Sequence, residues 1–336
     1  MNFDRILLSH GSGGLLTNNL IKDVILKYFN NKWLNELNDS ALIETNSNKI
    51  CFTTDSYVIN PIFFPGGDIG SLSIHGTVND LAVSGAKPLY ISVSFIIEEG
   101  LLFEEFERIL SSIKKAAEEA NVKIVTGDTK VVHKGTCDKI FINTAGIGIY
   151  NYKGNIGADK IMKGDAIIVN GNIAEHGAAI LCKREELNVD SDINSDSAPL
   201  NNLIERLKNI SNNIHCMRDA TRGGIGVVLL ELAKISGKDF IINERDIPIR
   251  ANVKAVCEIL GLDPLYIANE GKFLLFCDKC DADKILNEMK KDKYGKNAAI
   301  IGFVEKEGKG EVNLRTELGS IRIVDMPAGE LVPRIC

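Results

Sequence analysis

The spacing of apolar residues along the first half of the chain predicts strands and helices in alternation. Apolar, β-branched runs at Lys49–Asn60, Pro88–Ile97 and Lys139–Tyr150 are typical of strands. In Gly70–Gly85 and Leu102–Ala120 the apolar residues recur at helical spacing, which indicates helices packed on a core. We therefore expect an α/β domain in which helices cover one sheet.

The second half of the chain repeats this pattern. Asp165–Asn170 and Lys272–Cys277 are short apolar runs that predict buried strands. Helical spacing returns in Ile173–Lys183, Gly224–Ser236 and Ala251–Leu260. A second α/β unit of similar size is expected from this half.

A drop in hydrophobic density, with added glycines, marks Tyr152–Gly164 as the junction between the halves. We expect an N-terminal domain over 1–157, a C-terminal domain over 158–324 and a tail over 325–336. The tail carries two prolines and no clear periodicity, which favours an extended, mobile segment. The expected fold class is α/β, in an α+β arrangement of two α/β domains with a flexible C-terminal tail.

Composition narrows the class of protein. The 336 residues are 45% hydrophobic and 25% charged, as in folded soluble proteins. There is no apolar stretch of the roughly 20 residues that a membrane-spanning helix needs, and no secretory signal. The net charge is −6 without a basic tract, so we expect neither nucleic acid nor membrane as a partner. The eight cysteines of a chain this long predict reduced thiols and a cytoplasmic location.

A glycine-rich segment, His10–Gly14, is the first candidate for ligand binding. Gly11, Ser12, Gly13 and Gly14 allow the backbone to approach a ligand closely, and successive N–H groups can form a nest for an anion. The alternative is a simple turn before a helix expected at Leu15–Phe29.

Five aspartates at predicted strand and helix ends form the second candidate. Oxygen ligands from separate elements suit Mg²⁺, which completes its shell with phosphate and water. A cap or turn role is the alternative for each aspartate taken alone. The aspartates are Asp55, Asp68, Asp80, Asp128 and Asp219, with Asn79 and Thr129 beside two of them. Asp80 stands out because a charge inside an apolar helix pattern needs a partner or a metal.

The segment Arg218–Gly224 opens the predicted helix Gly224–Ser236. Gly223 and Gly224 would present backbone N–H groups at a helix N-terminus, where the helix dipole favours anions. Arg222 adds a planar set of donors for phosphate oxygens. Helix capping by Asp219 or Thr221 is the alternative, and it is compatible with phosphate binding.

Two residues are candidate bases. Lys134 lies on a glycine-containing loop, where a nearby cation would lower the pKa of its amine. Glu270 precedes the predicted strand Lys272–Cys277 and suits general acid–base chemistry. The alternatives are a solvated loop lysine and an ordinary turn residue.

Cys336, the last residue, stands at the end of the predicted tail. A prenylation motif needs its cysteine four residues from the end, so this thiol is not a lipid anchor. Twelve extended residues reach at most about 40 Å, far enough to visit a site across a domain or to reach a partner. The alternatives are a thiol carried on a mobile arm and a functionless end.

Taken in order, HGSGG, TTDSYVINPIFFPGGDIGSLSIHGTVNDLAVSGAKP, VTGDTKVVHKG, RDATRGG and the final PRIC resemble the HypE family of nickel–iron hydrogenase maturation proteins. This family belongs to an ATP-binding superfamily shared with aminoimidazole ribonucleotide synthetase, selenophosphate synthetase and thiamine-monophosphate kinase. The resemblance covers essentially the whole chain, and the terminal PRIC narrows it to HypE.

The resemblance implies an ATP-dependent carbamoyl dehydratase. A carbamoyltransferase, HypF, would load a carboxamide onto Cys336, and dehydration would convert it to a thiocyanate. The cyano group would then pass to iron on a scaffold of HypC and HypD, as a ligand of the hydrogenase site. A homodimer is implied as well.

The resemblance assigns the candidate residues to three roles: binding Mg²⁺, binding ATP and carrying out the reaction at Cys336. Mg²⁺ would be held by Asp55, Asp80, Asp128 and Asp219. ATP would be held by the glycine segments together with Asp55, Asp68, Asn79, Asp128, Thr129, Thr221 and Arg222. Cys336 would carry the group, with Lys134 and Glu270 as alternative bases.

Two other functions stay open at this stage. One is another synthetase or kinase of the superfamily, although a selenophosphate synthetase is expected to carry a reactive cysteine in the N-terminal glycine segment. Here Ser12 stands in that segment, and Cys51 is the first cysteine of the chain. The other is a non-catalytic thiol carrier, which has no use for a set of metal-binding carboxylates.

Overall fold

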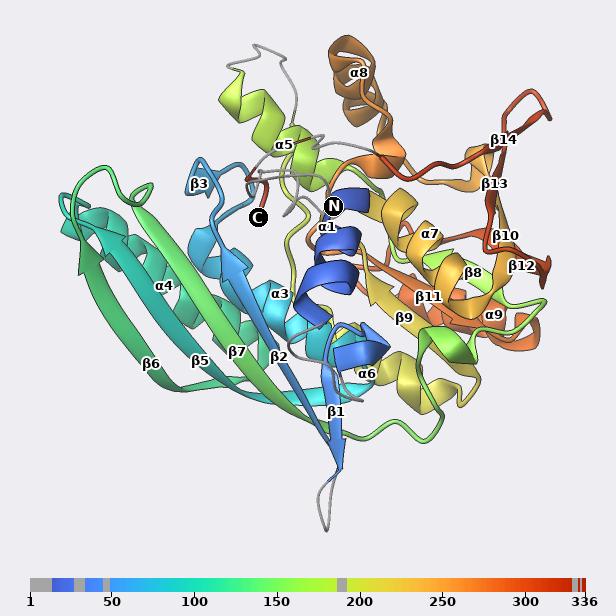
Figure 1. Cartoon of the computed structure of the whole chain (residues 1–336), viewed down its shortest axis with the longest axis horizontal. Helices are drawn as coiled ribbons and strands as arrows, with labels where there is room; N and C mark the ends of the chain where they lie inside the picture. Colours follow the sequence, from blue (N-terminus) through green and yellow to red (C-terminus); the bar gives the residue numbers. More distant parts are fainter. Residues whose placement is uncertain (1–13, 27–33, 45–48, 186–191, 328–331, 333) are drawn as a thin grey trace.

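A computed structural model describes residues 14–26, 34–44, 49–185, 192–327, 332 and 334–336. Two sheets divide these residues, one formed before residue 151 and one after residue 165 (Figure 1). Cys336 returns to the space between the sheets, near β3 (Phe63–Phe64) and α5 (Glu175–Arg184). The end of the chain therefore lies where both halves of the molecule can contact it.

The first sheet has five strands and is covered on one face by α3 (Ile69–Val83), on which α4 (Phe103–Ala120) packs. β5 and β6 are parallel, and the other pairs are antiparallel. The strand order is β1 (Ala41–Glu44), β2 (Lys49–Tyr57), β7 (Ile140–Tyr150), β5 (Ala86–Glu98) and β6 (Lys123–Val132).

Alternation along β2 decides which of its side chains reach the interior. Thr53, Asp55 and Tyr57 point to one face, while Phe52 and Ser56 point to the other and are exposed. The first face meets α3, which is buried on nearly all sides because it also contacts α6 (Asn201–Ile210). Asp55 is thereby placed on the face that the helix covers.

The second sheet has seven strands, and helices cover both of its faces. One core contains residues of α5, α7 (Gly224–Ser236) and α8 (Ala251–Leu260), and the other contains residues of α6 and α9 (Lys279–Met289). Ala82 and Val83 at the end of α3 join the second core, which connects the two halves. The strand order is β14 (Ile321–Ile323), β13 (Val312–Arg315), β10 (Lys238–Asn243), β12 (Ala299–Glu307), β8 (Ala166–Val169), β11 (Phe273–Cys277) and β9 (Ile214–Asp219).

Short elements complete the described chain. Near the N-terminus, α1 (Leu15–Leu20) continues as a wide π-turn at Ile21–Ile25. The helix expected at Leu15–Phe29 thus begins where predicted but does not stay a regular α-helix, and residues 27–29 lie outside the described part. The others are the helical turns Leu34–Glu36, Ala158–Lys160, Glu244–Asp246 and Pro264–Tyr266 and the strand β4 (Gly67–Asp68), which pairs with β3.

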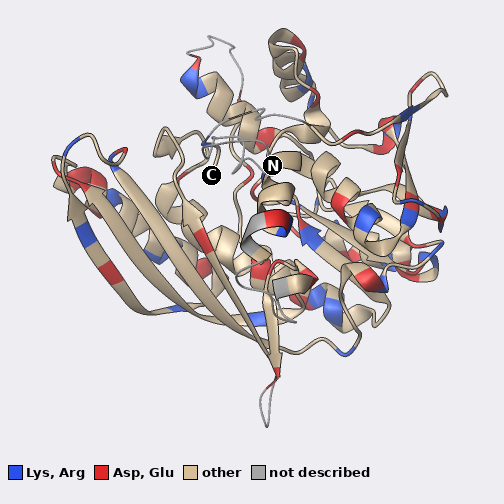
Figure 2. Cartoon of the chain, viewed as in Figure 1, with Lys and Arg blue, Asp and Glu red and all other residues tan. Residues whose placement is uncertain are grey.

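The predicted α/β fold is confirmed, with two mixed sheets and the helices where the spacing indicated them. The domain limits at residues 157 and 324 stay predictions. Acidic and basic residues are interspersed over both halves (Figure 2). In the part of the chain that the structure describes, every helix is too short or too polar to cross a membrane.

Candidate functional site

Strand pairing brings two distant segments together at one end of β9. Asp219 pairs with Phe273 of β11, so the turn Asn269–Lys272 lies beside the segment that follows Asp219. The Ala220 N–H donates to the Lys272 carbonyl at 2.9 Å, and the Asn269 side chain donates to the Ala220 carbonyl at 2.8 Å. Two motifs singled out in the sequence, RDATRGG and NEGK, therefore form one wall of a site.

Four aspartates form a carboxylate cluster that includes Asp219 of this wall: Asp39, Asp55, Asp80 and Asp219. Burial raises the pKa of Asp80 well above its ordinary value, and the charges of the other three raise it further. The Thr53 hydroxyl donates to Asp80 Oδ2 at 2.7 Å and opposes that rise. Burial and the charge of Asp39 likewise raise the pKa of Asp219 to about 8.

Arg218 is a positively charged side chain that contacts the cluster directly. Its Nε lies 2.7 Å from Asp39 Oδ1, and Nη1 donates to the Leu37 carbonyl at 2.9 Å. Burial nevertheless raises the pKa of Asp39 to about 6 against the opposing effect of Arg218. Arg222 opposes the raised pKa of Asp55 in the same way, but two arginines do not balance four carboxylates, so the cluster favours a further cation.

Mg²⁺ fits the chemistry of this cluster. All donors are carboxylate oxygens, and they come from separate elements of both halves of the molecule. Among the described residues, no three His, Cys, Asp or Glu side chains converge into a preformed metal site. Mg²⁺ does not need one, because it takes one or two carboxylates together with phosphate oxygens and water.

The tail end, Arg334–Cys336, is docked between the two sheets. Val58 N–H donates to the Cys336 carbonyl at 3.1 Å, and Asn60 N–H donates to the Arg334 carbonyl at 3.4 Å. The Arg334 side chain donates to the Val58 carbonyl at 3.0 Å. It also donates to Asp138 at 2.6 Å. Ile335 is buried in the core of the first half.

Docking places the Cys336 thiol among the groups of the site. Burial raises the pKa of this thiol to about 12, with Arg222 opposing the shift and Glu270 and Asp55 adding to it. The charge of Cys336 is in turn the largest cause of the raised pKa of Arg222. A docked Cys336 is therefore a neutral thiol at physiological pH, close to the residues that the motifs selected.

Glu270 is a buried carboxyl group with an unused oxygen. Oε1 has no hydrogen-bond partner among the described residues, and burial raises the pKa of the group well above its ordinary value. Its backbone is held on both sides, because N–H donates to Asp196 at 3.1 Å and the carbonyl accepts from Asn79 at 3.2 Å. An unsatisfied buried carboxyl of this kind is ready for a hydrogen-bonding substrate.

The N-terminus of α7 is shaped for close approach of a ligand. Gly223 and Gly224 adopt positive φ angles of 77° and 61°, and a side chain on Gly224 would come within 2.5 Å of the Leu265 carbonyl. Only glycine fits such a position. Backbone N–H groups free of side chains thus meet the positive end of the helix dipole beside Arg222, as expected for a phosphate site.

Several predicted site residues have other partners in the structure. Asp68 caps α3, accepting from Gly70 N–H at 2.8 Å and Ser71 N–H at 3.0 Å. The Asn79 side chain bonds only backbone groups, those of Ala198, Leu200 and Glu270, so it supports Glu270 in place of contacting a ligand directly.

Three other predicted site residues lie away from the cluster within one chain. Asp128 and Thr129 are exposed on the edge strand β6, and a hydrogen bond from Lys130 lowers the pKa of Asp128. Lys134 is exposed in the loop that connects β6 to β7. Of the two candidate bases, only Glu270 therefore lies near Cys336 in one chain.

The glycine segment lies largely outside the described residues, which include Gly14 but not Gly11, Ser12 or Gly13. Gly14 lies against the start of the tail, since the Leu15 N–H donates to the Pro327 carbonyl at 3.5 Å. The phosphate-binding role of the segment stays a prediction.

Some residues of the site carried no sequence signal. Asp39 precedes a short strand, and Asp196 falls in a polar stretch typical of a surface loop. Asp196 is in fact buried, and Lys272 Nζ lies 2.9 Å from its Oδ2. The only available signal was Arg218, since an arginine inside a strand before an aspartate needs a buried partner.

Comparison with known proteins identifies the family. Residues 37–150 match the family model described as AIR synthase related protein, N-terminal domain, and residues 162–315 match AIR synthase related protein, C-terminal domain. The carbamoyl dehydratase HypE of Cupriavidus necator is 45% identical over 333 residues, 99% of this chain and 95% of that protein. The chain belongs to the HypE family of carbamoyl dehydratases.

Solved HypE structures share the fold. A crystal structure of a HypE–HypF complex contains a chain that is 46% identical, with 92% of this chain and 99% of that chain covered and a TM-score of 0.88. A crystal structure of HypE in complex with ATP is 44% identical to this chain, with 99% of this chain and 100% of that chain covered and a TM-score of 0.84. The family expected from the motifs is thus confirmed, and the alternative of a kinase or another synthetase is wrong.

Proposed function

We propose that this chain dehydrates an S-carboxamide carried on its own Cys336 to a protein thiocyanate, with ATP as cosubstrate. The observation that carries the proposal is the docked tail end, which sets Cys336 among Arg222, Glu270 and the carboxylate cluster. Family membership supplies the activity class, and HypE in complex with ATP supports the cosubstrate.

The proposed reaction removes the carboxamide oxygen as phosphate. Phosphoryl transfer from ATP to that oxygen turns a poor leaving group into a good one. The C–O bond then breaks, the sulfur–carbon bond stays intact, and a carbon–nitrogen triple bond forms as the nitrogen loses both protons. The products are the thiocyanate, ADP, phosphate and one proton.

The chain's own residues position the groups and accept protons. Arg222 and the amide of Gly223 would bind phosphate oxygens at the start of α7, while Gly224, whose N–H donates to the Thr221 carbonyl at 3.0 Å, leaves room for their approach. The free Oε1 of Glu270 would accept a hydrogen bond from the carboxamide nitrogen, and burial raises the pKa of this group above its ordinary value, which favours proton uptake. Asp55, Asp80 and Asp219 would hold Mg²⁺, with Asp39 beside them; when bound, Mg²⁺ neutralises phosphate charge.

The proposed active unit is a homodimer formed through the open face of the first sheet. Phe52 on β2, Ile147 on β7 and Tyr90 on β5 are register partners on this face and are 42%, 41% and 46% exposed, so they form an apolar surface. A second copy on this face would bring Asp128, Thr129 and Lys134 toward the partner's nucleotide. These three predicted residues would then act across the interface.

The proposed partners follow from the chemistry of the tail. A carbamoyltransferase must load Cys336, and the HypE–HypF complex supports HypF in this role. The cyano group must then be accepted by iron, for which we propose the HypC–HypD scaffold. A free terminal thiol has to stay reduced throughout, so we place the reaction in the cytoplasm.

The variant Cys336→Ala tests the proposal. It should bind Mg-ATP as the unchanged protein does, because the phosphate-binding groups remain. It should release no phosphate beyond background after incubation with the carbamoyltransferase and carbamoyl phosphate. Calorimetry and phosphate release measure the two properties. Support of hydrogenase maturation by this variant would contradict the role of the terminal thiol.

A further inference from the structure

The tail end is held by a buried histidine at the start of α5. His176 Nε2 lies 2.7 Å from the Ile335 carbonyl oxygen, and its Nδ1 lies 2.7 Å from the Ser195 hydroxyl oxygen. The His176 side chain is fully buried, and Phe64 packs edge-on against its ring at 5.5 Å. Both ring nitrogens thus have a hydrogen-bond partner, as most buried polar groups do.

The two partners determine where the proton on the ring lies. A carbonyl oxygen only accepts, so Nε2 must carry the hydrogen and donate to Ile335. Nδ1 then carries the lone pair and accepts from the Ser195 hydroxyl. Ser195 Oγ in turn accepts from the Ser197 N–H at 3.1 Å. Burial keeps the ring neutral by lowering the pKa of His176, which leaves Nδ1 free to accept.

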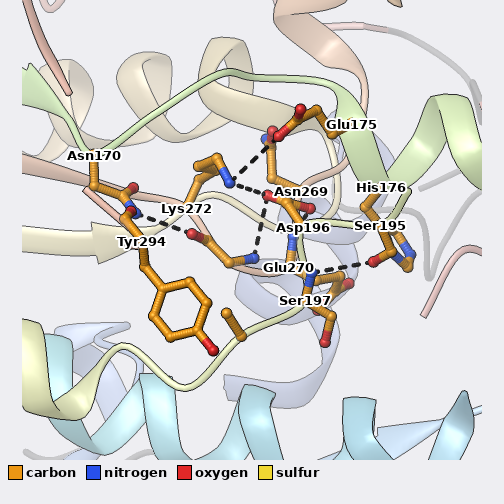
Figure 3. A network of polar contacts seen from close by, with 12 residues as sticks. Asn170, Glu175, His176, Ser195, Asp196, Ser197, Asn269, Glu270, Lys272 and Tyr294 are labelled. Atoms are coloured by element: carbon orange, nitrogen blue, oxygen red, sulfur yellow. Dashed lines mark hydrogen bonds and ion pairs between the residues drawn. The ribbon is translucent and has the colours of Figure 1, made fainter. Parts of the chain in front are cut away.

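The segment behind His176 also supports Glu270. Asp196 follows Ser195, and its carboxylate accepts from the Glu270 N–H at 3.1 Å and the Gly271 N–H at 3.3 Å (Figure 3). Ser195 N–H is fixed to the Pro65 carbonyl at 2.8 Å. One short segment therefore fixes both the histidine that holds the tail and the turn that carries the candidate base.

The geometry points to His176 as a positioning residue that holds the tail in its reacting position, with Ser195 fixing the tautomer. The inference rests on the proposed function for its catalytic consequence, but the docking itself is independent of it. His176 does not act on the carboxamide. It holds the Ile335 carbonyl, one residue before the thiol, and so sets the fraction of time that Cys336 spends in the site.

His176→Leu removes the donor and keeps an apolar side chain in the pocket. Without ATP, iodoacetamide should alkylate Cys336 of this variant roughly tenfold faster, the factor expected for one lost buried hydrogen bond. The rate is measured on the C-terminal peptide by mass spectrometry. His176→Gln, whose amide still donates, should stay near the unchanged rate, and Ser195→Ala should lie between.

His75→Leu is the matched control. His75 is also buried and bonds the same segment, through Nδ1 to the Ser197 hydroxyl at 2.9 Å, but makes no hydrogen bond to the described tail residues. Its substitution should leave the alkylation rate of Cys336 unchanged. An equal increase in both variants, or no increase in His176→Leu and Ser195→Ala, would overturn the inference.

The two half-reactions separate positioning from general damage. His176→Leu should dehydrate the preloaded carboxamide about tenfold more slowly, while HypF-type loading of Cys336, which needs an undocked tail, should not slow. A folding defect would slow both. If the unchanged protein shows no dehydration, the proposed function fails, while the alkylation rates still decide the role of His176.

Discussion

Glu270 is the residue on which the chemistry of this site depends most. Its Oε1 is buried without a described partner, and its raised pKa results mainly from burial and from the charges of Asp196 and Asp55. Such a group is costly to keep in a core unless it is used. Burial also raises the pKa of the nearby Cys336 thiol, to about 12.

Glu270→Gln should therefore remove proton transfer and leave the shape of the site intact. We expect the dehydration rate to fall by a factor of roughly 10² to 10⁴, the usual contribution of a positioned base, with Mg-ATP affinity unchanged. Single-turnover dehydration of the preloaded protein gives the rate, and calorimetry gives the affinity. A rate within threefold of the unchanged protein would show that Lys134, or another group, is the base.

At the residue scale, Asp80 could be singled out from the sequence because a carboxylate in an apolar helix pattern is costly without a partner, whereas Glu270 had an ordinary turn residue as its alternative. Asp39 and Asp196 could not be singled out, because each lies in a polar stretch that is equally typical of a surface loop. Only the folded chain shows that Lys272 and two backbone N–H groups surround Asp196. Its burial is a tertiary effect that local sequence does not encode.

The proposed phosphate-binding site depends on the N-terminus of α7. Gly224 has positive φ and meets the Leu265 and Ile267 carbonyl oxygens, which a side chain would approach to 2.5 and 2.6 Å. Gly237, at the other end of the same helix, also has positive φ but faces open space. Substituting each glycine in turn therefore distinguishes the cost of a strained φ angle from the cost of a steric clash.

Gly224→Ala should lower the free energy of unfolding by roughly 3 kcal/mol, from backbone strain and overpacking together. Gly237→Ala should cost about 1 kcal/mol, because only the strained φ is involved. Denaturant titrations of the two variants measure the difference. Equal losses would mean that the chain around Gly224 is free to move aside.

At the element scale, the long amphipathic helices were predicted well, since periodicity reports burial on one face. The strand β9 was missed although it carries Asp219. Its sequence IHCMRD places Arg218 inside a strand, and the pairing of Arg218 with Asp39 becomes visible only when the two halves of the molecule are packed together.

At the scale of the whole molecule, the carboxylate cluster is formed by both halves and opposes folding as it ionises. The folded-state pKa of each member is raised, to about 6 for Asp39 and about 8 for Asp219. Raised carboxyl pKa values mean that the folded chain binds more protons than the unfolded chain. The stability that these carboxyl groups contribute is fully present at a pH below their pKa values in the unfolded chain. It is lost as the pH rises through their pKa values in the folded chain.

Without metal, the melting temperature should therefore fall as the pH rises from about 4 to about 8. Mg²⁺ should restore more stability at the upper end than at the lower end. Asp219→Asn should flatten the dependence, because one titrating group and its repulsion are gone. Calorimetric melts of both proteins, with and without Mg²⁺, test this; parallel pH curves would contradict it.

The homodimer gives a second prediction at this scale. Lys134→Ala and Cys336→Ala should each be inactive alone. If Lys134 acts on the partner's Cys336, mixing the two variants should restore part of the activity, since a mixed dimer has one intact site. The mixture must first be shown to exchange subunits. If it then stays inactive, Lys134 does not act on the partner's Cys336.

The central claim is that the docked Cys336 is where a carboxamide loses its oxygen. The most direct measurement is the mass of the C-terminal peptide, taken before and after the carbamoylated protein is incubated with Mg-ATP. The account predicts that the peptide loses the mass of one water, in step with release of one phosphate per chain. An unchanged mass in a protein shown to bind Mg-ATP would contradict it.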